Sequence, residues 1–196
     1  MELKSFDRLV ESLSKLPSVG RKSAERMVYA MLNMDEEDLK EFSESVLGLS
    51  RIHRCSICGT YTEEDICDVC KDDNRDKTTL MVVSYPKDML AFEKSEGYDG
   101  LYHILNGAIS TSKGIGIEDL NIESLFQRLD KGDIKEVILA TNPNVDGETT
   151  ALYLSKKLEK YDINITRLAY GLQIGSALDY TDSLTLNKAL QGRHKM

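Results

Sequence analysis

The stretch Cys55-Ser-Ile-Cys-Gly-Thr-Tyr-Thr-Glu-Glu-Asp-Ile-Cys-Asp-Val-Cys70 divides the chain and holds all of its cysteines. Two Cys-x2-Cys pairs are separated by eight residues. Two residues between thiolates let one tight turn direct both sulfurs at one ion, and two such turns complete a tetrahedral all-sulfur site. The pattern predicts a structural Zn2+, with no open position for a reacting water. Its ligands would be Cys55, Cys58, Cys67 and Cys70.

The cysteine pattern is also compatible with other uses of the four thiols. Iron fits the same sulfur cage, a redox dithiol pair uses the same short spacing, and four unconnected buried thiols need no ion. His53 stands close to the first pair, but four cysteines already satisfy zinc, so we expect this histidine at the surface. Gly59 follows the first pair, where a tight turn needs a permissive backbone.

The segment before the cysteines is predicted to be helical. Apolar residues recur at helical spacing from Leu3 to Leu16 and from Ala24 to Leu32. The stretch between them, Leu16-Pro-Ser-Val-Gly-Arg-Lys-Ser-Ala24, resembles the helix-hairpin-helix motif Leu-Pro-Gly-Val/Ile-Gly-x-x-x-Ala. That motif grips DNA backbones without reading sequence, because the N–H groups and the dipole at the start of its second helix favour an anion.

Three basic residues at the start of this second helix are the predicted DNA contacts, namely Arg21, Lys22 and Arg26. Lys22 and Arg26 are four residues apart and therefore share one helix face. Ser18 replaces the first glycine of the motif, which weakens the expected phosphate contact. The alternative is an ordinary helical hairpin with a solvated basic face. The acidic stretch 35–38 is expected to open a third helix, where carboxylates suit the N-terminus.

After about residue 78 short apolar runs alternate with helical segments. This alternation is typical of an α/β domain with a mainly parallel sheet. Sites in such sheets collect at the C-terminal ends of strands, where we find the loops 84–88 and 141–148. The predicted strands are 80–83, 101–105, 136–140 and 165–169, and the predicted helices are 88–96, 122–129 and 149–160.

The 141–148 loop resembles the Asp-x-Asp motif of Toprim domains, which occur in topoisomerases, primases and some nucleases. Active members hold Mg2+ on three carboxylates, because Mg2+ prefers hard oxygen ligands. At the matching positions this chain has the neutral residues Ser84, Asn142 and Asn144. A metal-dependent enzyme would have to use the acids that remain nearby, which are Asp88, Asp146 and Glu148.

The order of these features resembles the RecR family of bacterial recombination mediators over nearly the whole chain. The likeness includes Tyr102-His-Ile-Leu-Asn-Gly-Ala-Ile-Ser110 and the tail that runs from Arg167 to Leu186 and ends with Ala189-Leu-Gln-Gly-Arg193. The chain departs from the family at Ser84, where a Glu is usual, at Tyr170, where a basic residue is expected, and at Gln173, where a proline is expected. Asp146 stands for a Glu, which is a mild change.

The resemblance implies an α+β multidomain protein with four parts. These are a helix-hairpin-helix domain over 1–53, a four-cysteine zinc finger over 54–78, a Toprim α/β domain with a mainly parallel sheet over 79–175, and a C-terminal oligomerisation segment over 176–196. It implies a non-enzymatic clamp, expected to be a homotetrameric ring, that binds single-stranded, double-stranded and gapped DNA. The clamp acts with RecO, and in some settings RecF, to load RecA onto single-stranded DNA.

The same resemblance makes Asp146 and Glu148 the expected contacts for RecO. A pure scaffold without DNA contact is the alternative, supported by Ser18 and by the formal charge of -8. That charge argues against a tight, strongly basic DNA binder, but the stretch from Lys15 to Arg26 holds four basic residues against Glu25 alone. We therefore expect weak, salt-sensitive binding. Without an apolar run of membrane length or a signal peptide, we expect a cytoplasmic protein that associates with the nucleoid during repair.

Overall fold

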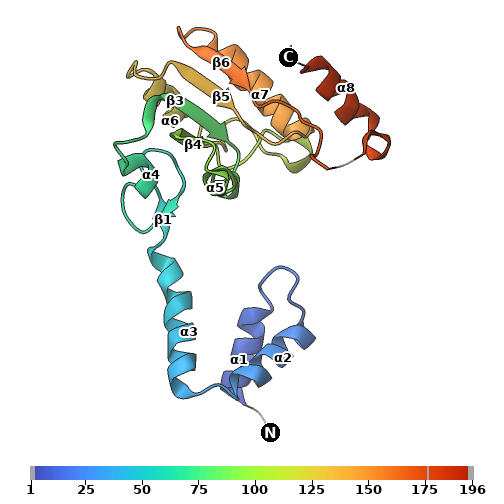
Figure 1. Ribbon diagram of the computed structural model, residues 1–196. Helices are drawn as coiled ribbons and strands as arrows, with labels where there is room; N and C mark the ends of the chain where they lie inside the picture. Colours follow the sequence, from blue (N-terminus) through green and yellow to red (C-terminus); the bar gives the residue numbers. More distant parts are fainter. Residues whose placement is uncertain (1–2, 176, 194–196) are drawn as a thin grey trace. The chain divides into compact units, whose positions relative to one another are not determined.

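The chain divides into two units, Met1–Ile52 and His53–Met196, drawn in the ribbon of Figure 1. The computed structural model describes residues 3–175 and 177–193. The helical first unit and the mixed second unit follow the fold class that the sequence predicts, with a helical N-terminus followed by a cysteine-rich segment and a parallel sheet. No helix among the described residues is long and apolar enough to cross a membrane.

The first unit consists of helices α1 (Lys4–Leu13), α2 (Arg21–Met31) and α3 (Glu36–Gly48), with a short 3-10 turn η1 at Leu49–Arg51. Its fully buried core is small and is shared by α1 and α2, with Val10, Ala24 and Val28 at its centre. The predicted third helix is confirmed, and the side chain of Asp35 caps it by accepting a hydrogen bond from the Asp38 N–H at 2.8 Å. None of the residues of α3 is buried.

The turn between α1 and α2 forms around Ser18, which has a φ of 66°. This left-handed conformation is the one that favours glycine, because a side chain there crowds the backbone. The hairpin motif that this segment resembles has a glycine at this position. The left-handed backbone of Ser18 is the physical reason for that glycine. Gly20 then precedes the first residue of α2, and no side chain caps the helix there.

The second unit begins with a small antiparallel pair, β1 (His53–Arg54) and β2 (Tyr61–Thr62), and the one-turn helix α4 (Asp68–Lys71). A four-stranded sheet follows, made of β3 (Asp76–Val83), β4 (Gly100–Ile104), β5 (Glu136–Leu139) and β6 (Asn164–Arg167). Its strand order is β4-β3-β5-β6 and every pairing is parallel. The prediction of a mainly parallel sheet is confirmed.

Different elements cover the two faces of this sheet. Helices α6 (Glu123–Leu129) and α7 (Val145–Leu158) pack on one face through Leu125, Leu129, Leu154 and Leu158. On the other face, helix α5 (Pro86–Ser95) contributes Met89, and the cysteine segment contributes three buried cysteines, with the partly buried Cys70 packed against them. The cysteines therefore belong to the same core as the strands β3 and β4.

Helix α7 begins four residues earlier than the sequence predicts, at Val145 instead of 149. The side chain of Asn144 accepts a hydrogen bond from the Gly147 N–H at 2.8 Å and so starts the helix. A Cβ on Gly147 would lie 2.0 Å from the carbonyl oxygen of Asn142, so only glycine fits this close turn. As a result, Asp146 and Glu148 lie on the first turn of a helix and not in a loop.

The chain ends in a tail that carries a 3-10 turn η3 (Leu178–Tyr180) and helix α8 (Ser183–Gln191). Another 3-10 turn, η2 (Thr111–Lys113), lies in the long connection that follows β4. Asp182 caps α8 by accepting a hydrogen bond from the Thr185 N–H at 3.0 Å. None of the residues of α8 is buried, which leaves this helix held less firmly than α6 or α7.

Replacing Ser18 with glycine should stabilise the first unit. Glycine adopts the left-handed conformation without the crowding that serine suffers, so we expect the free energy of unfolding to rise by about 1 kcal/mol. The matched control is Ser23→Gly in α2, where glycine should lower that free energy by about 0.5 kcal/mol. Amide hydrogen exchange in α1 and α2 measures both effects, and a loss of stability in Ser18→Gly would contradict the strain at this turn.

Candidate functional site

The four predicted zinc ligands come together in the structure. The Sγ atoms of Cys55, Cys58, Cys67 and Cys70 all lie within 4.8 Å of one another, and three of the four residues are buried. Each pair sits on a tight turn, in which the Gly59 N–H donates to the Cys55 carbonyl at 3.0 Å and the Cys70 N–H donates to the Cys67 carbonyl at 3.0 Å. The predicted need for glycine after the first pair is confirmed, since Gly59 has a φ of 80°.

The chemistry of this cluster fits a zinc ion. The four thiols share charge: the Cys58 and Cys70 thiols hold the pKa of Cys67 well below its ordinary value, while contact with Cys67 and burial raise the pKa of Cys58. A metal ion is therefore needed to hold all four sulfurs as thiolates. The Cys67 N–H also points at the Cys55 sulfur, at 3.3 Å. When bound, the ion would supply folding energy and no catalysis, because four sulfurs complete its coordination. His53 is exposed and stands outside the cluster, as expected.

The cluster is also attached to the sheet. The Ile104 N–H at the end of β4 donates to the Cys58 carbonyl at 2.8 Å. A Cβ on Gly59 would meet the side chain of Asn121 at 2.9 Å, so this turn lies tightly against the connection after β4. Cys55, Cys58 and Cys67 pack in one core with residues such as Met81, Tyr102 and Ile104. Sequence spacing identified the ligands but gave no signal for this attachment.

The predicted DNA contacts lie at the start of α2. Lys22 and Arg26 are exposed, and neither forms an ion pair within the part of the chain that the structure describes. Arg21 is also exposed, but its Nε donates to Glu25 Oε1 at 3.1 Å, so part of its charge is already balanced. Since no side chain caps the helix at Gly20, the first N–H groups of α2 are available to an anion.

The positions that carry carboxylates in active Toprim enzymes hold neutral residues here, and these residues contribute to the local structure. Ser84 directly follows β3 and is fully buried, with no hydrogen-bond partner for its Oγ among the described residues. Asn144 caps α7, and the carbonyl of Asn142 lies against Gly147. Asp88 is also occupied, because its carboxylate accepts the Tyr85 N–H at 2.9 Å and caps α5.

The two acids predicted to contact a partner each have a basic neighbour in the chain. Asp146 lies 3.4 Å from Lys113 Nζ. Glu148 lies 2.6 Å from a guanidinium nitrogen of Arg167, and both side chains are partly buried. Burial alone would raise the pKa of Glu148, but the Tyr170 hydroxyl and the Arg167 charge beside it hold that pKa below its usual value. Among residues 3–175 and 177–193 the cysteines form the one candidate metal cluster, so Asp88, Asp146 and Glu148 are not brought together.

Sequence reasoning missed the role of Arg167. Its guanidinium donates to the carbonyl oxygens of Leu139 at 2.6 Å and Thr141 at 2.7 Å as well as to Glu148. One side chain therefore ties β6, the end of β5 and the first turn of α7 together. The only available signal was a basic residue in the middle of the predicted strand 165–169, which is too common to identify such a role.

Replacing Cys67 with serine should abolish zinc binding and destabilise more than the zinc finger. Because the cysteines share a core with β3 and β4, the thermal midpoint of the whole second unit should fall. Zinc content by atomic absorption and thermal unfolding by circular dichroism measure the two effects. The control is Glu63→Gln, an exposed change within the same segment. Unchanged metal content and thermal midpoint in Cys67→Ser would refute the structural role.

Ser84 offers a test of the Toprim edge. Its hydroxyl is buried without a partner among the described residues, so Ser84→Ala should leave the free energy of unfolding unchanged or slightly higher. Ser84→Glu restores the usual family residue but buries a carboxylate, and we expect it to cost about 3 kcal/mol. Chemical denaturation of both variants measures these energies. A stable Ser84→Glu protein together with a destabilised Ser84→Ala protein would contradict the environment described for this position.

Comparison with protein families gives four matches in chain order. The family described as RecR, helix-hairpin-helix, matches residues 6–47. The RecR four-cysteine zinc finger domain matches residues 52–72 and the Toprim domain matches residues 78–169. The RecR C-terminal family matches residues 174–194. The cysteine cluster is therefore a zinc finger of the RecR type, and zinc is its metal.

Curated relatives extend this similarity over almost the full chain. The Recombination protein RecR of Lactobacillus helveticus is 48% identical over 187 residues, which are 94% of this chain and 94% of the relative. The protein of the same name from Enterococcus faecalis is 46% identical over 190 residues, which are 96% of each chain. The one from Limosilactobacillus reuteri is 48% identical over 191 residues, again 96% of each chain. With these identities and the ordered set of four matches, the chain belongs to the RecR family.

Proposed function

We propose that the protein is a DNA-binding recombination mediator that works in recombinational repair. In this proposal it forms a ring-shaped clamp, acts with RecO and in some settings with RecF, and helps to load RecA onto single-stranded DNA. It binds single-stranded, double-stranded and gapped DNA through phosphate contacts that carry no sequence information. It acts in the cytoplasm, on the nucleoid during repair. Residues 1–53 serve as the helix-hairpin-helix domain, 54–78 as the zinc finger, 79–175 as the Toprim domain and 176–196 as the oligomerisation segment.

The observation that carries the proposal is the pair Lys22 and Arg26. Both are exposed on one face of α2, and neither is neutralised by an acid within the described residues. They stand beside the uncapped start of the helix, where N–H groups and the helix dipole favour a phosphate. Arg21 adds a third positive charge, which Glu25 partly balances. A small basic surface of this kind supports weak, salt-dependent binding.

The Toprim edge supports a role without catalysis. Its three carboxylate positions hold Ser84, Asn142 and Asn144, and Asp88 serves as a helix cap. In the proposal, Asp146 and Glu148 on the first turn of α7 instead contact basic side chains of RecO. Both acids are partly exposed, although each already has a basic neighbour of its own.

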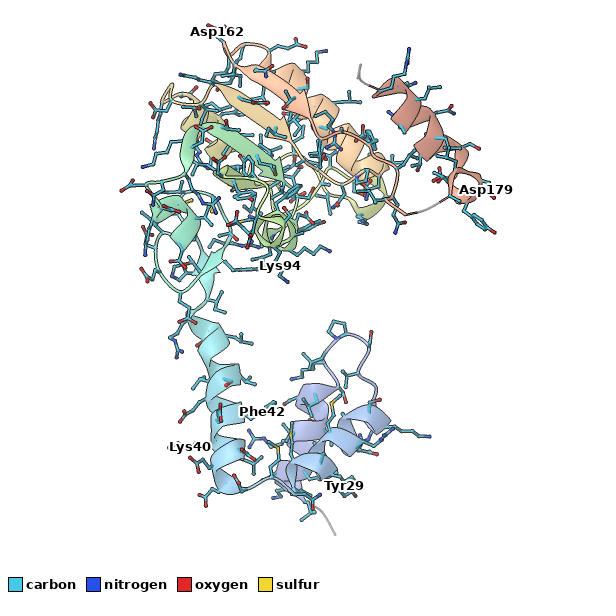
Figure 2. The ribbon with its side chains drawn as sticks, in the orientation of Figure 1. Tyr29, Lys40, Phe42, Lys94, Asp162 and Asp179 are labelled. Carbon is cyan, nitrogen blue, oxygen red and sulfur yellow. The ribbon has the colours of Figure 1, made fainter. Side chains whose placement is uncertain are left out.

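Exposed apolar side chains support the homotetramer. Helix α3 has no buried residue and exposes Phe42 and Val46 by 41% and 53%, and Phe42 is labelled in Figure 2. The tail exposes Leu178, Tyr180 and Leu184 to a greater extent. Apolar surface of this extent is uncommon on a monomer and is typical of protein interfaces. The tail is the segment that the proposal assigns to joining subunits.

The double variant Lys22→Ala/Arg26→Ala should bind gapped DNA about tenfold or more weakly than the native protein. The affinity of the variant should also depend less on salt, by roughly one phosphate contact for each residue replaced. Each cation that is removed leaves one phosphate with its counterions, so fewer counterions are released on binding. Fluorescence anisotropy at several salt concentrations, with and without Mg2+, measures both effects. Binding should not require Mg2+.

The matched control is Lys40→Ala/Lys94→Ala, which removes the same charge from two exposed positions labelled in Figure 2. This control should retain most of the native affinity. If the two double variants bound gapped DNA equally well, the assignment of the DNA-binding face to α2 would be wrong. If native protein failed to bind any DNA at low salt, even with RecO present, a scaffold without DNA contact would replace the proposal.

A further inference from the structure

A polar pocket of about 400 Å³ lies between the zinc finger and the connection that follows β4. The zinc finger contributes Arg54 and Ile57 to its lining. The connection and the start of α6 contribute Asn106, Asp119 and Ser124. A volume of this size is enough for a small ring system. The whole pocket belongs to the second unit, so it is a separate site from the DNA contacts proposed on α2.

Arg54 presents a flat cation on the zinc-finger side of the pocket. Its guanidinium lies 4.3 Å from the centre of the Tyr61 ring, which belongs to the residue opposite it in the β1–β2 pair. Its Nη1 donates to the Gly59 carbonyl at 3.1 Å, and its Nη2 donates to the Tyr61 hydroxyl at 3.4 Å. No acid forms an ion pair with it among the described residues. Arg54 and Tyr61 are both exposed, so together they form a fixed and accessible surface for stacking.

Asn106 places an amide without a full set of partners at the same pocket. Its Oδ1 is buried and has no hydrogen-bond partner among the described residues. Its Nδ2 lies beside the zinc-finger turn, 3.6 Å from the place that a Cβ on Gly59 would take. A buried acceptor without a donor is unfavourable, and a ligand with an N–H group would satisfy it. The pocket therefore offers a hydrogen-bonding group as well as a stacking surface.

The charges of the pocket favour a neutral ligand. Arg54 brings one positive charge and Asp119 brings one negative charge. The carboxylate of Asp119 would repel a phosphate inside the pocket, and the guanidinium of Arg54 would repel a cation. A nucleobase is neutral, has a π face that stacks on an arginine plane, and carries N–H and carbonyl groups at its edge. These properties match the guanidinium of Arg54 and the amide of Asn106.

We propose that this pocket holds an unpaired base of single-stranded DNA, stacked on Arg54 and hydrogen-bonded by Asn106. The inference rests on the proposed function, in which the protein binds DNA, and adds a second kind of contact to it. The contacts proposed on α2 are made to phosphates, which single and double strands both offer. A base can enter a pocket only where it is unpaired, so this contact favours single strands. It tolerates different sequences, because every base has a π face.

Single-stranded DNA with and without bases tests the pocket. An oligonucleotide of stable abasic residues keeps the phosphates of a normal strand of equal length and lacks its bases. The native full-length protein should bind the normal strand about tenfold more tightly, as expected for a base that stacks on protein. Arg54→Ala should bring the affinity for the normal strand to within about twofold of that for the abasic strand, and should change duplex binding by less than about twofold. Fluorescence anisotropy gives the dissociation constants.

Further variants separate stacking from charge and from folding. Arg54→Lys keeps the charge but loses the planar guanidinium, so it should lose the preference for bases as Arg54→Ala does. Asn106 has a φ of 64°, which glycine adopts freely. Asn106→Gly therefore removes only the amide, and should weaken binding of the normal strand by about threefold. The matched control is Lys157→Ala, which removes another exposed cation over a tyrosine ring, 5.7 Å from the centre of Tyr153, and should change neither affinity.

Zinc content shows whether the finger remains folded in each variant. If Arg54→Ala loses zinc, Asn106→Gly decides. Equal binding of normal and abasic strands by the native protein would overturn the inference, and so would a native preference for bases in zinc-loaded Arg54→Ala or in Asn106→Gly. Loss of RecO binding in zinc-loaded Arg54→Ala, with its preference for bases intact, would assign the pocket to a protein contact instead.

The proposed function fails in a different way. Lys22→Ala/Arg26→Ala should weaken binding of normal, abasic and duplex DNA alike, because it removes phosphate contacts. If this variant bound all three as the native protein does while Arg54→Ala lost the preference for bases, the pocket would stand and the DNA-binding face on α2 would be wrong. If the native protein bound none of the three at low salt, the proposed DNA binding would be wrong and the base pocket with it.

Discussion

The packing of the cysteine cluster against the parallel sheet is the constraint on which the second unit depends. Cys55, Cys58 and Cys67 share a core with Met81 and Tyr102, so the zinc finger and helix α5 together cover one face of the sheet. A zinc finger, whose folding is coupled to metal binding, therefore supplies part of the burial that the strands need. Metal binding, sheet stability and the position of the strand ends are linked through this one contact.

Much of the architecture could be predicted because its signals are local. The Cys-x2-Cys spacing, the helical periodicity before it and the alternation of strands and helices after it all depend on near neighbours in sequence. Helix α3 and the parallel sheet were expected for this reason, as was the tight turn at Gly59. The early start of α7 was not, because the cap formed by Asn144 was interpreted as part of a loop.

The features that escaped prediction depend on residues far apart in sequence. Arg167 reaches Glu148 across nineteen positions, and Lys188 meets Tyr170 from a different element. Nothing in the composition of either segment indicates its partner. Ser84 is a similar case. The sequence shows that a carboxylate is missing at this position, but it does not show that the serine is completely buried. The residues proposed for DNA binding and for RecO remain predictions, because a contact with a second molecule leaves no mark on the packing of this chain.

Arg167 also changes what kind of cation this Toprim edge contains. Active Toprim enzymes gather carboxylates around a divalent ion that enters from solvent and leaves again. Here a guanidinium, covalently part of the chain, binds the end of β5 and the carboxylate of Glu148. Its charge belongs to a side chain of the protein and cannot be exchanged or chelated. The edge thus has an internal counterion for Glu148, which the chain itself supplies from β6.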